Sequence, residues 1–204
     1  MRGRIGIRES MQDTERKEAA LPTSIFLIGM MASGKSTIGK ILARTLGWPF
    51  FDVDREIEKR SGVAIPTIFE LEGEAGFRAR ETQMMAELTA KPGAVVAMGG
   101  GAPMFEINRT LLKRGFVIEL RSSVSDILER TRRDTSRPLL QTEDRARRIR
   151  ELLLERRPVY TSVADAFVVT SRANPERVVE RILAMPEVAA IRARVDAGQR
   201  GEPA

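Results

Sequence analysis

The residues best suited to chemistry form the segment Gly29–Ser36, which reads GMMASGKS and fits the pattern G-x-x-x-x-G-K-[ST]. It ends a short apolar run, Ser24–Met30, and a helix-like pattern follows it from Lys35 to Leu46. Glycines in such a loop let backbone N–H groups converge on phosphate oxygens, and the helix N-terminus adds positive potential. Lys35 would place a charge at the terminal phosphates, and Ser36 would supply a hydroxyl ligand to Mg²⁺. We therefore expect a nucleotide-binding loop.

Two carboxylates, Asp52 and Asp54, close the next apolar run, Phe50–Val53. Residues at i and i+2 of a strand point to the same side, so we expect both carboxylates beside the phosphates. One would serve the water shell of the metal, and the other would face an incoming hydroxyl group. The alternative is that Asp54 caps the helix that begins near Ile57.

Candidate acceptor-binding residues lie further along the chain. Three consecutive glycines, Gly99–Gly101, follow the apolar run Ala94–Met98 and cost backbone entropy. Their presence is explained if a ligand lies directly against the main chain. Arg78 comes four residues after Glu74 and three before Glu81, which fits either an anion site or a solvated ladder of helix ion pairs.

Two basic segments complete the set. Thr131–Leu140 (TRRDTSRPLL) predicts a mobile lid with an arginine that clamps phosphate, or else an ordinary surface loop. Arg156 and Arg157 end a predicted long helix, where cations favour the helix dipole whatever the function. Taken together, these residues predict phosphoryl transfer from ATP to a small hydroxy-carboxylate.

The composition narrows the alternatives. The 204 residues, 42% hydrophobic and 30% charged, indicate one globular domain. The absence of Cys and His excludes disulfides, thiol nucleophiles and Ser-His-Asp triads, so acid–base chemistry falls to carboxylates. No apolar run approaches the ~18 residues of a membrane span. The net charge of +6 arises largely between Arg121 and Arg157, a stretch with almost no aromatics for base stacking. We expect no nucleic-acid or membrane partner and a cytoplasmic location.

Short apolar runs alternate with helical patterns, which predicts a parallel sheet covered by helices on both faces. The expected strands are Ser24–Met30, Phe50–Val53, Ala94–Met98, Phe116–Leu120 and Ala166–Thr170. Residues 1–20 are polar and aperiodic, so we expect a disordered extension there. The domain is expected to span residues 21–185. Residues 186–204 are Ala/Arg/Gly-rich and weakly periodic, which predicts a tail.

With these motifs in this order, the chain resembles the shikimate kinases. The resemblance covers roughly Ser24–Leu183 and rests on GMMASGKST, FFDVDREIEKRSG, GEAGFRARE, MGGGA, TSRPLL and RRPVY. It implies an α/β fold, a three-layer α/β/α P-loop kinase with a five-stranded parallel sheet, a lid at about residues 130–142 and a small acceptor-binding helical subdomain. It also implies a monomer that uses ATP and Mg²⁺ to phosphorylate the 3-hydroxyl of shikimate, a step towards aromatic amino acids.

On the nucleotide side, the resemblance implies a set of residues that wrap the ATP phosphates. These are Gly29, Ala32, Ser33, Gly34, Lys35, Ser36 and Thr37. Ser36 would also ligate Mg²⁺, and Asp52 would touch the water shell of the metal. Arg130 would lie near adenine. Arg137 would reach the transferring phosphate from the lid and join Lys35 among the catalytic residues.

On the acceptor side, the resemblance implies that Asp54 binds the shikimate hydroxyls and acts as the base. Arg78 and Arg156 would bind the shikimate carboxylate, while Gly99, Gly100 and Gly101 would line its ring. Two positions depart from the family pattern. Ala32 stands where the family usually has Gly, and a positive φ there would cost energy. In the loop Thr170–Pro175, the place of a second adenine-side arginine falls on Ala173, with Arg172 adjacent.

Two rival functions remain open at this point. One is a kinase of the same fold that acts on another polyhydroxy acid, such as gluconate. The other is a nucleotide-binding regulator that kept the fold and lost turnover. Both rivals are disfavoured by the acceptor-side set, which comprises Asp54, Arg78, Gly99–Gly101 and Arg156. The set favours shikimate over gluconate as the acceptor, and it favours an active kinase over a regulator without turnover.

Overall fold

The structure, a computed structural model, describes residues 5–7, 23–132, 142 and 144–200. Its centre is a six-stranded sheet in the order β1-β6-β5-β2-β4-β3. The strands are β1 (Ile5–Ile7), β2 (Ile25–Ile28), β3 (Phe50–Asp52), β4 (Val95–Ala97), β5 (Phe116–Arg121) and β6 (Ala166–Val169). Strands β2 to β6 pair in parallel, which confirms the five-stranded parallel sheet, and β1 adds an antiparallel edge beside β6.

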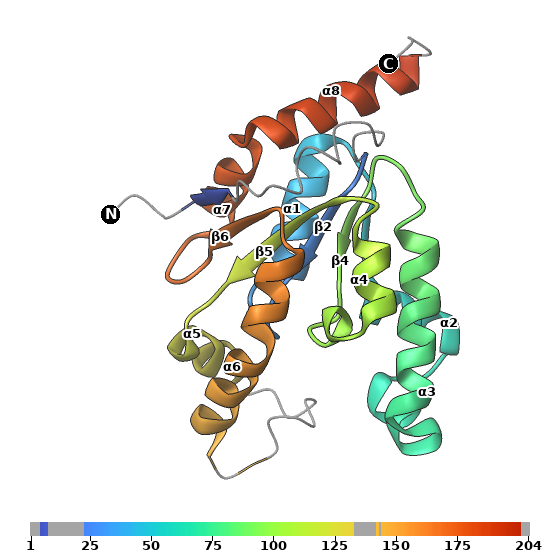
Figure 1. The fold of residues 1–204 in the computed structure, drawn as a ribbon, viewed down its shortest axis with the longest axis vertical. Coiled ribbons are helices and arrows are strands. Elements are labelled where there is room, and N and C mark those ends of the chain that lie inside the picture. The colour runs from blue at the N-terminus through green and yellow to red at the C-terminus, as the bar shows by residue number, and fades with distance from the viewer. Residues whose placement is uncertain (1–4, 8–22, 133–141, 143, 201–204) are drawn as a thin grey trace.

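Helices cover both faces of this sheet (Figure 1). They are α1 (Lys35–Leu46), α2 (Val53–Ser61), α3 (Ile65–Leu88), a 3₁₀ turn η3 (Ala102–Met104), α4 (Glu106–Leu112), α5 (Val124–Thr131), α6 (Arg145–Val163), α7 (Pro175–Leu183) and α8 (Pro186–Arg200). None of these helices is both long and apolar enough to cross a lipid bilayer.

Strand β2 shows how the layers arise from the pleat, because successive side chains point to opposite faces. Ile25 and Leu27 belong to the core shared with α1, α7 and α8. Phe26 and Ile28 belong to the core on the other face, shared with α2, α3, α4, α5 and α6. All four side chains are fully buried. This burial on both faces explains why the strand reads as a continuous apolar run.

Several expected boundaries differ from the structure, and two of them concern residues near the site. Helix α6 does not end at Arg157 but continues through Pro158 to Val163. A proline removes one backbone donor, and here the helix retains its packing through buried residues on both sides of it, Ile149 and Tyr160. The second strand ends at Asp52, so the residues after it belong to α2.

The expectation of a C-terminal tail is wrong for residues 186–200, which form α8. Val188, Ile191 and Val195 are 1%, 3% and 8% exposed and follow one another at i, i+3 and i+7. This spacing places them on one side of a helix, where they extend the core that contains α1 and α7. The expectation of disorder at the N-terminus is wrong for residues 5–7, which form β1.

Candidate active site

The loop between β2 and α1 contains two glycines that the conformation requires. Gly29 has φ +138°, and a Cβ there would lie 2.5 Å from the carbonyl oxygen of Leu120, so a side chain has no room. Gly34 precedes α1 with φ +101° in the left-handed region. The chain then enters α1 directly, and the first N–H groups of a helix have no partner within it. The predicted strand–loop–helix context of the phosphate motif is therefore present.

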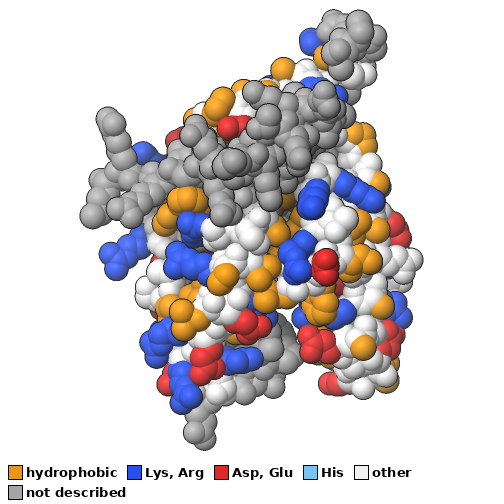
Figure 2. All heavy atoms as spheres, in the orientation of Figure 1, with side chains coloured by type: hydrophobic (Ala, Val, Ile, Leu, Met, Phe, Trp, Pro, Cys, Tyr) orange, Lys and Arg blue, Asp and Glu red, His pale blue; other side chains and the backbone are white. Residues whose placement is uncertain are grey.

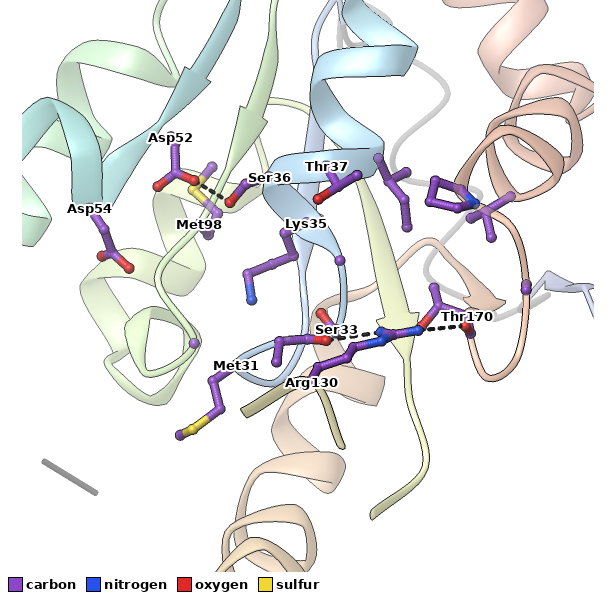
Figure 3. Close-up of a pocket in the computed structure, with 17 residues that line it drawn as sticks. Met31, Ser33, Lys35, Ser36, Thr37, Asp52, Asp54, Met98, Arg130 and Thr170 are labelled. Atoms are coloured by element: carbon purple, nitrogen blue, oxygen red, sulfur yellow. Dashed lines mark hydrogen bonds between the residues drawn. The ribbon is translucent and has the colours of Figure 1, made fainter. Parts of the chain in front are cut away.

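Lys35 extends from the first turn of α1 across this loop. Its Nζ donates hydrogen bonds to the carbonyl oxygens of Gly29 and Met30 at 2.9 and 2.8 Å. Figure 3 shows its ammonium group between the side chains of Asp54 and Arg130. These residues line one cavity of about 610 Å³ together with residues of the loop. The positive charge of Lys35 thus borders a cavity large enough for a small ligand.

Ser36 and Asp52 meet at the same cavity from α1 and the end of β3. The Ser36 hydroxyl donates a 2.5 Å hydrogen bond to Oδ2 of Asp52 (Figure 3). Both groups are oxygen donors of the kind that Mg²⁺ prefers. Their contact brings together the two residues expected at the metal.

Asp54 lies in the first turn of α2 and lines the same cavity. It is not on the strand with Asp52, as the i, i+2 spacing predicted, yet both residues still reach the phosphate loop. The alternative role as a helix cap is also wrong. Asp52, not Asp54, occupies the cap position, and its side chain makes no capping hydrogen bond.

Two of the glycines after β4, Gly99 and Gly101, lie tightly against side chains of the protein itself. A Cβ on Gly99 would overlap Oε1 of Glu81, and a Cβ on Gly101 would lie 2.8 Å from Nη2 of Arg78. A Cβ on Gly100 would lie 3.6 Å from Nη1 of Arg156. The glycine shelf (Gly99–Gly101) is therefore where the acceptor-side residues expected from the sequence come together.

Arg78 is held by partners on three sides. Its Nη1 donates to Oε2 of Glu81 at 2.8 Å and its Nη2 to Oε1 of Glu74 at 3.1 Å. Its guanidinium carbon lies 5.2 and 5.1 Å from the ring centroids of Phe77 and Phe105. The ion pairs considered as an alternative do exist. Only the Glu74 pair is solvated, because the Glu74 side chain is 66% exposed whereas the Glu81 side chain is 1% exposed.

Glu81 is a buried carboxylate that the sequence analysis treated only as an ion-pair partner. Burial raises the pKa of this carboxyl group, and the nearby Arg78 opposes that shift. Its Oε1, which faces Gly99, has no hydrogen-bond partner among the described residues. The only sequence signal for this role is its position three residues after Arg78.

Arg156 reaches the glycine shelf from the opposite side. It is 6% exposed, and its Nη1 donates to the carbonyl oxygen of Gly100 at 3.3 Å. Its Nε has no hydrogen-bond partner among the described residues. The helix-dipole explanation for Arg156 is wrong, because α6 continues to Val163. In the space-filling view, a notch separates the lobe that contains α3, which carries Arg78, from the lobe that contains α6 (Figure 2).

The far end of the cavity is formed by Arg130 and the loop after β6. Nη1 of Arg130 donates to the carbonyl oxygen of Ala32 at 2.9 Å, and Nη2 donates to that of Thr170 at 3.1 Å. Arg130 belongs to α5, so it is anchored on the fold. Ala173 lines this end of the cavity. Arg137 and most of the expected lid lie outside the described residues.

Comparison with known proteins identifies the family. A family model described as shikimate kinase matches residues 31–187. A shikimate kinase of Methylococcus capsulatus is 49% identical over 174 residues, which cover 85% of this chain and 97% of that protein. The solved structure of a shikimate kinase from Acinetobacter baumannii in complex with shikimate matches with a TM-score of 0.77 and 44% identity, covering 83% of this chain and 94% of that one. The chain belongs to the shikimate kinase family.

Shikimate kinases use ATP with Mg²⁺, and the donors in this site fit that metal. Magnesium usually takes one or two protein carboxylates and completes its shell with phosphates and water. Ser36 and Asp52 supply such a small oxygen set. Within the described residues, no group of three or more acidic side chains forms a closed metal cage. The metal would therefore be held jointly by the protein and the nucleotide.

The departure from the family pattern at Ala32 has a structural cost. Ala32 adopts φ +56°, in the left-handed region that glycine occupies without strain. The conditional expectation of a positive φ at this position is confirmed. The second departure from the family pattern is Ala173, at the place of a second adenine-side arginine. Ala173 lines the cavity, whereas the neighbouring Arg172 is not among the residues that line it.

Tyr160 is a second residue that the sequence analysis missed. It lies one turn after Arg156 on α6, is 1% exposed, and donates a 2.5 Å hydrogen bond to the carbonyl oxygen of Gly100. The RRPVY motif contains it, but a tyrosine at helical spacing gives no sign of which backbone group it will reach.

Proposed function

We propose that the phosphate loop and the residues around the glycine shelf divide the work of one reaction. This reaction transfers the γ-phosphoryl group of ATP to the 3-hydroxyl of shikimate and yields shikimate 3-phosphate and ADP, in the pathway to aromatic amino acids. One observation carries the proposal. Asp54 lines the same cavity as the phosphate loop, while Arg78 and Arg156 flank the adjacent glycine shelf.

On the nucleotide side, the backbone N–H groups of Ala32–Thr37 bind the ATP phosphates and Lys35 balances their charge. Ser36 would ligate Mg²⁺ and Asp52 would contact its water shell, and the metal would draw charge from the phosphate oxygens. Arg130 borders the adenine end of the cavity. Arg137 approaches the transferring phosphate from the lid and stabilises its charge.

On the acceptor side, Asp54 accepts the proton of the 3-hydroxyl as that oxygen bonds to the γ-phosphorus. The bond between the γ-phosphorus and the β–γ bridging oxygen breaks, and ADP leaves with its new charge balanced by Lys35. Arg78 and Arg156 bind the shikimate carboxylate across the glycine shelf, since arginine pairs with carboxylates through two parallel hydrogen bonds.

The test is ADP release by the purified protein with ATP and Mg²⁺, in the presence of shikimate, gluconate or no acceptor. We expect release that depends on shikimate and is lost in Lys35→Met, which removes the charge and keeps the length of the side chain. Faster release with gluconate would assign another polyhydroxy acid. Nucleotide binding without any acceptor-dependent release would indicate a regulator.

We also propose a monomer that works in the cytoplasm on small molecules, with residues 21–185, extended by α8, as the catalytic domain. Basic and acidic side chains are interspersed on the face shown in Figure 2, which is unlike the continuous basic surface of a nucleic-acid-binding domain. Light scattering coupled to size exclusion tests the monomer, and a dimer mass would overturn it.

A further inference from the structure

The Tyr160 hydroxyl joins three parts of the active site. It projects from α6, donates to the Gly100 carbonyl oxygen on the glycine shelf, and lies 3.8 Å from Sδ of Met30 in the phosphate loop. These three elements come from distant parts of the chain. A single buried hydroxyl therefore sets how the shelf sits relative to both ligand-binding sides.

The Gly100 carbonyl oxygen accepts from two side chains of the same helix. Arg156 donates to it at 3.3 Å and Tyr160 at 2.5 Å, and the two residues are one helical turn apart. The surroundings of this glycine are in ordinary packing contact. A Cβ on it would lie 3.5 Å from the backbone nitrogen of Met31 and 3.6 Å from Nη1 of Arg156. Because the Arg156 guanidinium is hydrogen-bonded to the Gly100 carbonyl, a shift of this carbonyl would displace the acceptor of that bond.

Tyr160 keeps this bond over the whole working pH range. Burial raises the pKa of its hydroxyl to about 12, with Arg156 opposing the shift. The hydroxyl is thus a permanent donor, and it cannot act as a base near neutral pH. Its effect must pass through the groups that it holds.

We infer that Tyr160 is a positioning residue for acceptor binding, which fixes the Gly100 carbonyl and through it the direction of the Arg156 guanidinium. The inference rests on the proposed role of Arg156 as a ligand of the shikimate carboxylate. A carboxylate pair with arginine depends strongly on the orientation of the guanidinium plane. Tyr160 therefore contributes to shikimate affinity without touching shikimate.

The alternative is that Tyr160 only fills the core, since its ring belongs to the cluster between the sheet and α6. The substitution Tyr160→Phe separates the two roles because it keeps the ring and removes the hydroxyl. We expect the KM for shikimate to rise about three- to tenfold, the range for one lost hydrogen bond. The kcat should stay within about twofold, and the affinity for ATP without shikimate should not change.

Ser24→Ala is the matched control. The Ser24 hydroxyl is also buried and donates to a main-chain carbonyl, that of Lys91, at 2.7 Å, but outside the residues that line the active-site cavity. It should lower the melting temperature and leave the KM for shikimate unchanged. In an Arg156→Ala background, Tyr160→Phe should add little further increase in KM, because its effect passes through Arg156.

A second measurement avoids substitution altogether. Tyr160 is the only tyrosine in the chain, so 3-fluorotyrosine incorporated biosynthetically reports on this site alone. Saturation with shikimate should shift its ¹⁹F resonance, and Arg156→Ala should abolish the shift. An unchanged KM in Tyr160→Phe, or a resonance that shikimate does not move, would overturn the inference. If the unsubstituted protein shows no shikimate-dependent turnover, it is the proposed function that fails.

Discussion

Asp54 and Glu81 approach the same glycine from two different helices. A Cβ on Gly99 would lie 3.1 Å from Oδ1 of Asp54 on α2 and would overlap Oε1 of Glu81 on α3. Two carboxylates at such a point repel each other, and Arg78 supplies a compensating charge to Glu81 at 2.8 Å. The proposed base therefore shares its surroundings with a buried ion pair.

Asp54→Asn should lower kcat by about 10²–10⁴-fold, the usual contribution of a positioned acid–base group. The amide keeps the size of the side chain and cannot accept the proton. The dissociation constant of ATP, measured by calorimetry, should stay unchanged. A fall in kcat of less than tenfold would limit Asp54 to orienting the substrate.

Glu81→Gln should change how stability depends on pH. Burial raises the pKa of Glu81 above its ordinary value near 4.5, so the folded protein binds this proton more tightly than the unfolded chain. Its contribution to the free energy of unfolding is therefore greatest below 4.5 and is lost as the pH rises through the raised pKa. Urea denaturation should show the unsubstituted protein gaining stability relative to Glu81→Gln as the pH falls from 7.5 to 5. A difference that is flat, or grows with rising pH, would contradict this environment for Glu81.

Arg156→Ala should raise the KM for shikimate at least tenfold. A charge-assisted hydrogen bond contributes ~1.5–3 kcal/mol, which corresponds to about ten- to more than a hundredfold in affinity. The control is Arg157→Ala, because Arg157 is its exposed neighbour on the same helix. Steady-state kinetics with varied shikimate should separate the two variants. Equal KM values would leave Arg78 as the sole candidate for the carboxylate.

Ala32→Gly should stabilise the protein by up to ~1 kcal/mol. The left-handed conformation at φ +56° costs an L-residue ~1–2 kcal/mol, and glycine avoids this cost. Glycine also loses more chain entropy on folding, which offsets roughly 0.5–1 kcal/mol of the gain. The control is Ala164→Gly, because Ala164 has φ −80°, where alanine is unstrained. That variant should lose about 0.4–1 kcal/mol. Thermal unfolding should show that the two substitutions change the stability in opposite directions. A destabilised Ala32→Gly would rule out strain at this position.

Ile191→Ala should destabilise the protein by about 2–5 kcal/mol, because it removes a buried side chain from the contact of α8 with the core. Ile107→Ala is the matched control. Ile107 is 60% exposed, and its loss should cost about 0.5 kcal/mol or less. Chemical denaturation of the two variants gives the comparison. Equal effects would mean that α8 contributes little to the stability of the domain.

Local patterns in the sequence were sufficient for the five parallel strands and for the phosphate loop. The expected strands Ser24–Met30 and Phe116–Leu120 contain β2 and most of β5, and Gly47 ends α1 in the left-handed conformation. These features depend on neighbours along the chain. Glu81 and Tyr160 were missed because their roles depend on contacts with Gly99 and Gly100, which only the fold brings near.

The errors at the chain ends have a related cause. Helix α8 has three buried residues on one side and small or charged residues elsewhere, so its pattern is weak without its partner. The pairing of β1 with β6 joins residues about 160 apart in sequence. The three residues of β1 are also too few to show the alternation of a strand. The helix expected to end at Arg157 continues through Pro158, because the loss of one backbone donor did not outweigh the packing of that helix.

Strand β1 has a consequence for how the protein behaves in concentrated solution. Its pairing, Ile5 with Val168 and Ile7 with Ala166, covers the outer backbone of β6. A strand without such cover offers its free N–H and C=O groups to any passing chain. A version that starts at Thr23 would keep every residue of the active site and still leave β6 open to edge-to-edge association. The first few residues would then protect the protein from aggregation rather than assist its chemistry.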